Sequence, residues 1–273
     1  MLSYQHIYHA GNFADVQKHS VLIHLLKLIK KQHKIITVLD THSGRGLYNL
    51  NSKEAKKTEE FVYGIKHFWN MREEKNPLSD YLNLIKQVNN NKNLTSYPGS
   101  AKIIEILLRN KAKITLAEKH PKEIIYLKES IKENDNIKIY KDDGFNILGN
   151  IVFENKTLVI IDPSYEVKDE YNDIGLHIYN AYKKNQNTTF FIWYPILKSG
   201  HHYKMLEFIN TKISAPIICG EIILQQQIKE NFGMFGSGLI IINPPEKFET
   251  GFDKINRFIC KRSIHTTEYQ RKF

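Results

Sequence analysis

Cysteine is scarce in this sequence, and long apolar runs are missing from it. Its two cysteines, Cys219 and Cys260, lack partners at the spacing of metal-binding or disulfide motifs, which argues against a zinc site and a disulfide framework. The longest apolar runs, such as Thr157–Ile161 and Leu239–Ile242, fall far short of the ~20 residues that span a bilayer. The first residues show neither the basic nor the apolar stretch of a secretory signal. We therefore expect a cytoplasmic protein that does not associate with membranes.

Negative charge is also in deficit. The 273 residues include 39 Lys and Arg against 29 Asp and Glu, so the formal net charge is +10. The apolar share of 41% and the charged share of 25% are typical of a folded soluble domain and exclude wholesale disorder, collagen-like repeats and coiled coils. The positive excess favours a nucleic-acid or nucleotide partner. A compositional drift toward lysine would produce the same charge, so charge alone does not decide the partner.

Short strand-like runs alternate with helical periods along most of the chain. The expected strands are Ile35–Leu39, Lys113–Ala117, Ile137–Tyr140, Leu158–Ile161, Thr189–Trp193, Ile217–Leu224 and Leu239–Ile242. Several are apolar throughout, as strands covered on both faces should be. Helical spacing occurs between them, for example over Ile124–Ile131 and around Met205. This order predicts an α/β fold with a mostly parallel sheet and helices on both faces.

The N-terminal region departs from this alternation. Asn12 can cap a helix, with Asp15 three residues further on, and an apolar stripe follows from Val21 to Ile29. Lys18 lies on the same face as this stripe. Either its side chain reaches back to solvent along the apolar surface, or it has a function inside the protein.

A second departure is the stretch of residues 47–97. The spacing of apolar residues predicts one helix from Phe61 to Trp69, a break at Pro77 and a second helix over Leu78–Ile85. We interpret residues 47–97 as an inserted helical subdomain, and residues 1–46 and 98–273 as the main domain.

Acidic residues follow the ends of several expected strands. Gly44 and Gly46 follow the first strand and allow a tight turn beside a ligand, but Asn49 stands where a dinucleotide-binding fingerprint needs glycine. Glu118 and Asp143 follow the next two strands. A carboxylate after the second strand can accept both hydroxyls of a ribose, and one after the third can accept an adenine amine. Each alone is typical of a helix cap or turn, but four acids in register, with Asp40 and Asp162 at the other two strand ends, are much harder to assign to caps alone.

The fourth strand end carries the sequence Asp162-Pro163-Ser164-Tyr165. Pro163 fixes the backbone, so the Asp162 carboxylate and the Pro163 carbonyl can converge on one amino group. Tyr165 offers an aromatic face on which a base can stack. Alone, the tetrapeptide would be read as an ordinary turn.

With these residues the sequence resembles class I methyltransferases that methylate amines, whose fourth motif is usually Asp-Pro-Pro-Tyr. More closely it is similar to the ribosomal large-subunit RNA methyltransferase J family. The resemblance is carried by Met1-Leu2-Ser3-Tyr4, His6, His9-Ala10-Gly11-Asn12, Ala14-Asp15-Val16, Lys18-His19, Asp40-Thr41-His42, Gly44, Gly46, Tyr97-Pro98-Gly99-Ser100, Glu118, His120-Pro121, Asp143-Gly144-Phe145, Asp162-Pro163, Tyr165-Glu166, Trp193-Tyr194-Pro195, Ser237-Gly238 and Asn243-Pro244-Pro245.

The resemblance implies a Rossmann-like fold and transfer of a methyl group from S-adenosylmethionine to the N6 amine of an adenine in 23S ribosomal RNA. It implies that the cofactor is bound by His19, His42, Ser100, Glu118, Asp143, Gly144 and Asp162. The catalytic residues would be Asp162, Pro163, Tyr165 and Lys18, and the substrate would contact Tyr4, His6 and Tyr165. Free or early precursor RNA is the expected partner. A monomer is favoured, although the sequence leaves the oligomeric state open.

Two alternatives remain at this point. Ser164 stands where the family has a second proline, which would fit a catalytically impaired RNA- or DNA-binding relative. Asp162 with Glu166 and Lys168 resembles the metal site of some nucleases, which would suit a link to the use of external DNA. The short separation of these residues disfavours a nuclease, and we predict that no metal is needed.

Overall fold

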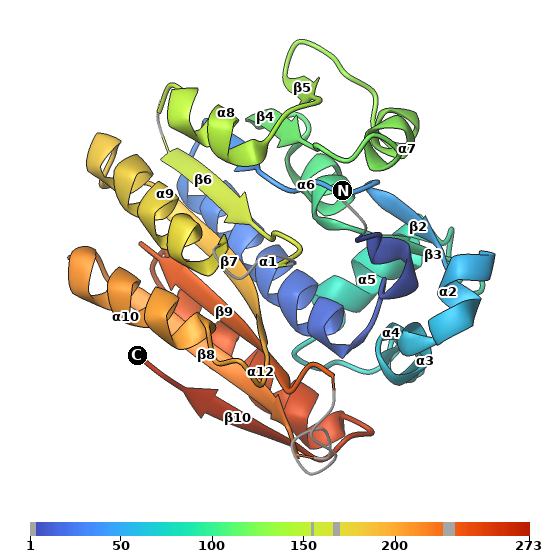
Figure 1. The fold of residues 1–273 in the computed structure, drawn as a ribbon. Helices are drawn as coiled ribbons and strands as arrows, with labels where there is room; N and C mark the ends of the chain where they lie inside the picture. Colours follow the sequence, from blue (N-terminus) through green and yellow to red (C-terminus); the bar gives the residue numbers. More distant parts are fainter. Residues whose placement is uncertain (1–3, 154–155, 166–169, 226–232) are drawn as a thin grey trace.

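The computed structural model describes residues 4–153, 156–165, 170–225 and 233–273. Its main sheet has eight strands in the order β10-β8-β9-β7-β6-β1-β4-β5 (Figure 1). The strands are β1 (Ile36–Asp40), β4 (Ala112–Ala117), β5 (Ile137–Tyr140), β6 (Lys156–Ile161), β7 (Thr189–Ile196), β8 (Ile217–Leu224), β9 (Gly236–Ile242) and β10 (Thr267–Arg271). All the strands expected from the sequence are present, and β10 is an addition.

The sheet is parallel from β5 to β7 and mixed beyond β7. β1 pairs in parallel with β4 on one side and with β6 on the other. β9 is antiparallel to both β7 and β8, and β10 is antiparallel to β8. The strand order reverses at β1, and open α/β sheets bind ligands beyond the carboxyl ends of the strands at such a reversal.

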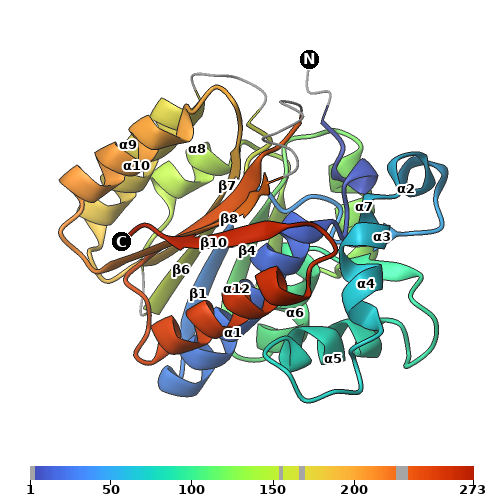
Figure 2. The ribbon, with the colours of Figure 1, turned by 90° about the horizontal axis from the view of Figure 1, so that it is seen from below.

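Helices cover both faces of the sheet, as Figure 2 shows. One face carries α1 (Phe13–Gln32), α6 (Ser100–Leu108), α7 (Glu123–Ser130) and α12 (Phe248–Arg262), and the other carries α8 (Gly144–Asn150), α9 (Glu170–Lys184) and α10 (His202–Lys212). The apolar side chains form two separate buried clusters, one on each face. The predicted α/β architecture is therefore confirmed. Among the described residues, no helix is long and apolar enough to cross a membrane.

The N-terminal part forms a short 3-10 helix, η1 (His6–Tyr8), followed by α1. The Asn12 side chain accepts a hydrogen bond from the Asp15 backbone N–H at 3.0 Å and so caps α1, as predicted. The apolar stripe of α1 packs into the buried cluster on its face of the sheet.

Residues 47–97 begin and end in a two-stranded sheet of β2 (Leu47–Asn49) and β3 (Ser96–Pro98). The helices between them are α2 (Lys53–Thr58), α3 (Glu60–Tyr63), α4 (Ile65–Trp69) and α5 (Ser79–Val88). The single helix expected from Phe61 to Trp69 is wrong, because it is interrupted at Gly64. The backbones of Gly64 and Gly11 approach each other closely here. A Cβ atom on residue 64 would lie 2.0 Å from the Gly11 carbonyl oxygen, so only glycine fits at this position. The division into two domains stays a prediction.

Candidate active site

A cavity of about 690 Å³ lies beyond the carboxyl ends of β1, β4, β5 and β6. Its volume is typical of small-molecule sites, which span about 300–1,000 Å³. Every residue assigned to the site from the sequence lines this cavity, namely Tyr4, His6, Lys18, His19, His42, Ser100, Glu118, Asp143, Gly144, Asp162, Pro163 and Tyr165. The fold therefore brings together residues from the N-terminus and from four successive strand ends.

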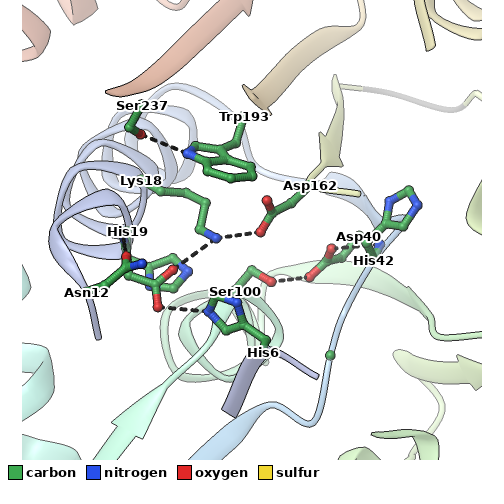
Figure 3. Close-up of polar contacts among 12 residues, drawn as sticks. His6, Asn12, Lys18, His19, Asp40, His42, Ser100, Asp162, Trp193 and Ser237 are labelled. Atoms are coloured by element: carbon green, nitrogen blue, oxygen red, sulfur yellow. Dashed lines mark hydrogen bonds and ion pairs between the residues drawn. The ribbon is translucent and has the colours of Figure 1, made fainter. Parts of the chain in front are cut away.

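Lys18 extends from α1 into the cavity and binds two carboxylates. Its Nζ lies 2.6 Å from Asp162 Oδ2, 3.0 Å from Asp15 Oδ1 and 5.0 Å from the centre of the Trp193 ring (Figure 3). The residue is only 4% exposed, so the alternative in which it reaches solvent is wrong. Burial disfavours the ammonium form, but the Asp15 and Asp162 carboxylates outweigh it and raise the pKa of Lys18. Lys18 is thus a fixed cation between two acids.

Asp15 connects Lys18 to the N-terminal residues of the cavity wall. Its Oδ2 accepts a hydrogen bond from the Gly11 N–H at 2.8 Å and lies 2.9 Å from His6 Nε2. His6 Nδ1 in turn lies 2.8 Å from the Tyr4 hydroxyl. Burial would raise the pKa of Asp15, but the charges of His6 and Lys18 hold it well below its ordinary value. The sequence pattern indicates Asp15 only as a residue of the helix start, although its spacing of three from Lys18 places both residues on one helix face.

Asp40, the last residue of β1, is buried at the bottom of the site. The Ser100 hydroxyl donates to Asp40 Oδ2 at 2.7 Å, and the His42 N–H lies 3.4 Å from Oδ1. Burial raises the pKa of Asp40 to about 7, the Ser100 hydrogen bond opposes this, and the nearby Asp162 adds to it. Asp40 was not among the predicted site residues, yet an acid that ends an apolar strand is the same signal that identified Asp162.

Glu118 holds the backbone of the glycine-containing turn after β1. Its Oε2 accepts a hydrogen bond from the Gly44 N–H at 2.8 Å, and its Oε1 accepts one from the His120 N–H at 2.7 Å. Gly44 has a φ of +58°, a conformation that favours glycine. Burial raises the pKa of Glu118 above its ordinary value, and these backbone donors limit the shift.

Asp143 caps the short helix α8 at the next strand end. Its Oδ1 accepts a hydrogen bond from the Phe145 N–H at 3.0 Å, and its Oδ2 lies 3.0 Å from Lys119 Nζ. Burial would raise the pKa of Asp143, but the contact with Lys119 and the capping bond lower it. A side chain on Gly144 would meet the Thr41 carbonyl at 2.0 Å, so α8 approaches the β1 turn at van der Waals distance.

Two histidines of the cavity wall are held in the neutral form. His19 Nδ1 lies 2.7 Å from the Tyr97 hydroxyl, and burial lowers the pKa of His19 to about 3. His42 contacts the Phe145 ring edge to face, with the ring centres 5.3 Å apart, and burial lowers its pKa to about 4. Neutral rings can pack against a nucleoside without adding charge to the site.

The loop after β6 carries the Asp162-Pro163-Ser164-Tyr165 motif. Tyr165 adopts a φ of +54°, which is uncommon for a residue with a bulky side chain. Its hydroxyl donates to the Trp193 carbonyl at 2.6 Å, and its ring centre lies 4.5 Å from that of Tyr171. Tyr165 is only 7% exposed, so in this structure the ring anchors the loop. Its stacking on a base stays a prediction.

Glu166 and Lys168, on which the nuclease alternative depends, lie outside the described residues. Within the described ranges, no group of three or more His, Cys, Asp or Glu side chains is arranged to hold a metal ion.

Comparison with known proteins identifies the family. The model of the family described as ribosomal RNA large subunit methyltransferase D, RlmJ, matches residues 33–272. The chain belongs to this family. It is 34% identical over 267 residues to ribosomal RNA large subunit methyltransferase J of Haemophilus influenzae. The aligned region covers 97% of this chain and 95% of that protein. The corresponding protein of Escherichia coli is 33% identical over 257 residues, which covers 93% of this chain and 91% of that protein.

A solved structure has the same fold over nearly the whole chain. The crystal structure of protein LPL1258 from Legionella pneumophila is 35% identical to this chain, with a TM-score of 0.89 and coverage of 97% of this chain and 98% of that chain. Family membership confirms the predicted family, the methyltransferase class and the use of S-adenosylmethionine. Neither the nuclease nor the impaired relative is favoured by these matches.

Proposed function

We propose that this member of the family transfers a methyl group from S-adenosylmethionine to the N6 amine of an adenine in 23S ribosomal RNA. The observation that carries the proposal is the meeting of Asp162 and Pro163 with Lys18 in one cavity at the sheet reversal. The relatives' names specify large-subunit ribosomal RNA, which supports the choice of substrate.

The cavity suits the cofactor in size and in the placement of its acceptors. We assign the ribose hydroxyls to Glu118 and the adenine amine to Asp143, both of which line the cavity. Ser100, Gly144 and the neutral rings of His19 and His42 complete that end of the site. Asp40 lies behind Ser100, whose hydroxyl donates to it. When bound, S-adenosylmethionine would supply an electrophilic methyl group on a positively charged sulfur, which keeps the electrons of the broken C–S bond and leaves as a neutral thioether. The acids around Asp162 suit the charge of the sulfonium.

Asp162 and Pro163 would orient the amine that receives the methyl group. The lone pair of an adenine amine is delocalised into the ring, so it is a weak nucleophile. Two fixed acceptors hold the nitrogen and stabilise the positive charge that develops as its bond to the methyl carbon forms. Lys18 binds Asp162 Oδ2, so we assign Oδ1 to the amine. The target base must leave its stack to reach this position, and Tyr4, His6 and Tyr165 line its side of the cavity.

Lys18 acts in this proposal as a cation and does not accept a proton. Its raised pKa keeps Nζ protonated at neutral pH, so the proton lost from the amine leaves by way of Asp162 or water. The role of Lys18 is to fix the Asp162 carboxylate in position and to balance part of the negative charge of the two acids.

The net charge of +10 suits an RNA substrate. We propose free or early precursor 23S RNA as that substrate, a cytoplasmic location and a monomeric protein.

The test is methyl transfer from labelled S-adenosylmethionine to 23S RNA that lacks modifications, followed by mapping of the labelled base. We expect label at N6 of one adenine with the parent, and no label per folded molecule with Asp162→Asn, whose folded fraction must be measured because Lys18 loses an ion-pair partner. Transfer that persists in Asp162→Asn would contradict the assignment. Degradation of DNA that depends on Mg²⁺, without methylation of RNA, would favour the nuclease.

A further inference from the structure

Glu60, at the start of α3, links the inserted helices to the N-terminal segment, which we define as residues 4–12. Its Oε1 lies 2.8 Å from His9 Nδ1, and its Oε2 accepts a hydrogen bond from Asn12 Nδ2 at 3.0 Å. One carboxylate from residues 47–97 thus holds both the middle and the end of the N-terminal segment. In Figure 1, α2, α3 and α4 lie beside this segment.

The backbones of the two segments also meet at this junction. The Ile65 N–H donates to the Gly11 carbonyl at 2.8 Å. A side chain on Gly11 would meet Ile65 Cγ2 at 2.7 Å, and Gly11 has a φ of +79°. Close packing of this kind transmits small displacements from one segment to the other.

The contacts of Glu60 lead directly to side chains of the cavity wall. The His9 ring is stacked on the Tyr4 ring, with the ring centres 5.7 Å apart and an angle of 9° between the planes. Asn12 caps α1, the helix that carries Lys18. Tyr4 therefore contacts one partner of Glu60 directly, and Lys18 lies on the helix that the other partner caps.

The hydrogen-bonded pair of Glu60 and His9 is partly open to solvent. Both side chains are 37% exposed. The hydrogen bond to Glu60 raises the pKa of His9, with burial opposing and the Glu60 and Asp15 charges adding to the rise. At this exposure the pair adds little to global stability, which leaves room for a role in positioning.

We propose that Glu60 is a positioning residue for the substrate side of the active site. Through His9 it sets the place of the Tyr4 ring, and through Asn12 it sets the start of α1. The inserted helices thereby determine the geometry at which the target base meets Asp162. This inference rests on the proposed function for its kinetic readout, but the contact itself can be measured without it.

The experiment compares Glu60→Ala, His9→Ala and the double variant with the parent. Glu59→Gln is the matched control, because Glu59 precedes Glu60 directly and is exposed. For each protein we would measure kcat and KM with 23S RNA, the Kd for S-adenosylmethionine by calorimetry, and the hydrogen exchange of the amides of residues 5–12. If Glu60→Ala lowers turnover on RNA but leaves the cofactor Kd unchanged, the residue has a positioning role and its loss does not disrupt the structure generally.

We expect Glu60→Ala to lower kcat/KM for RNA by about tenfold to a hundredfold, since small misplacements of reacting groups have effects of that order. The Kd for S-adenosylmethionine should change by less than about twofold. The double variant should lose less than the product of the two single losses, because both variants remove the same contact between Glu60 and His9. Exchange of amides 5–12 should accelerate in Glu60→Ala and stay at the parental rate in Glu59→Gln.

Parental kcat/KM in Glu60→Ala, or additive losses in the double variant, would overturn the proposal. So would equal losses of melting temperature, cofactor binding and turnover, which would show that Glu60 is only structural. Failure of the proposed function would appear elsewhere, as a parent protein that does not methylate 23S RNA. In that case unchanged exchange of residues 5–12 in Glu60→Ala would still refute the positioning role.

Discussion

Lys18 and its two acids show how the site depends on contacts between residues that are far apart in the chain. Lys18 and Asp162 are separated by 144 positions, so their ion pair leaves no local pattern in the sequence. The strand-end acids Glu118, Asp143 and Asp162 could be found from the sequence because each follows an apolar run. The spacing of three relates Asp15 to Lys18, but the contact of Asp15 with His6 could not be recognised, because the path of the N-terminal segment is set by packing against residues 47–97.

At this scale we predict that Lys18→Met lowers turnover while cofactor binding is preserved. Methionine keeps most of the apolar length of lysine, but the Asp162 carboxylate loses the cation that fixes it. We expect kcat to fall by about a hundredfold per folded molecule, the order expected for a misplaced catalytic group. Lys31→Met is the control, since Lys31 is exposed on the same helix.

Breaking a buried ion pair also costs about 3–5 kcal/mol of stability, so active-site titration or the folded fraction must normalise the rates. A variant that melts earlier but turns over normally per folded molecule would show that Lys18 is structural.

The second residue-scale prediction concerns Glu118. Replacing it by alanine removes the acceptor assigned to the ribose hydroxyls and releases the Gly44 N–H, so we expect binding of S-adenosylmethionine to weaken by about 2–3 kcal/mol. Isothermal calorimetry measures this, with Glu129→Ala as a control at an exposed position of α7. Equal affinities for the parent and Glu118→Ala would exclude the assignment.

Among the elements, strands were predictable where apolar residues run together and unpredictable where they do not. β1 and β4 to β9 were expected to within a few residues. Most of them are buried on both faces and are therefore apolar runs, whereas β5 shows the alternation of buried and exposed residues. β10, with the sequence Thr-Glu-Tyr-Gln-Arg, lies at the sheet edge and has no such run. The break at Gly64 was missed because apolar spacing is the same in one helix and in two. The break between α3 and α4 follows from the close approach of the Gly11 backbone to Gly64, which apolar spacing does not reveal.

The loop between β6 and α9 gives a prediction at the scale of elements. Nothing in the proposed chemistry uses the side chain of Ser164, so Ser164→Pro should leave methylation within about twofold of the parent. It should raise the free energy of unfolding by about 0.4–1 kcal/mol, because proline restricts the unfolded chain. Denaturant titration and initial rates measure the two effects. If the parent binds cofactor and RNA without methylating, and Ser164→Pro restores activity, the impaired relative is the correct interpretation.

For the whole molecule, the buried titratable groups determine how stability depends on pH. His19 and His42 have folded pKa values of about 3 and about 4 against an ordinary 6.5, so between these values the unfolded chain binds protons that the folded chain does not. Stability therefore falls as the pH drops through this range. Asp40 acts in the opposite sense, because the folded protein keeps its proton up to about pH 7 and the unfolded chain loses it near 3.8.

We predict that Asp40→Asn makes stability more dependent on pH. Asparagine cannot carry the proton that Asp40 keeps in the folded protein. Between about pH 4.5 and 6.5, the free energy of unfolding should therefore rise with pH more steeply than in the parent, by about 1.4 kcal/mol per pH unit. Chemical denaturation at several pH values gives this slope. Asp135→Asn, at an exposed position, serves as the control and should follow the parent. An unchanged slope in Asp40→Asn would mean that Asp40 titrates alike in both states.

The placement of the two tryptophans gives this protein a built-in optical signal. Trp193 lies in the cavity wall, where its indole N–H donates to the Ser237 hydroxyl at 2.8 Å and Lys18 lies over its ring. Trp69 is the last residue of α4, and its side chain is buried among residues 47–97. Any movement of Lys18 or Asp162 changes the electric field at the Trp193 indole and shifts its emission. In a Trp69→Phe variant, fluorescence would follow cofactor and RNA entering the active site in real time, without an added dye.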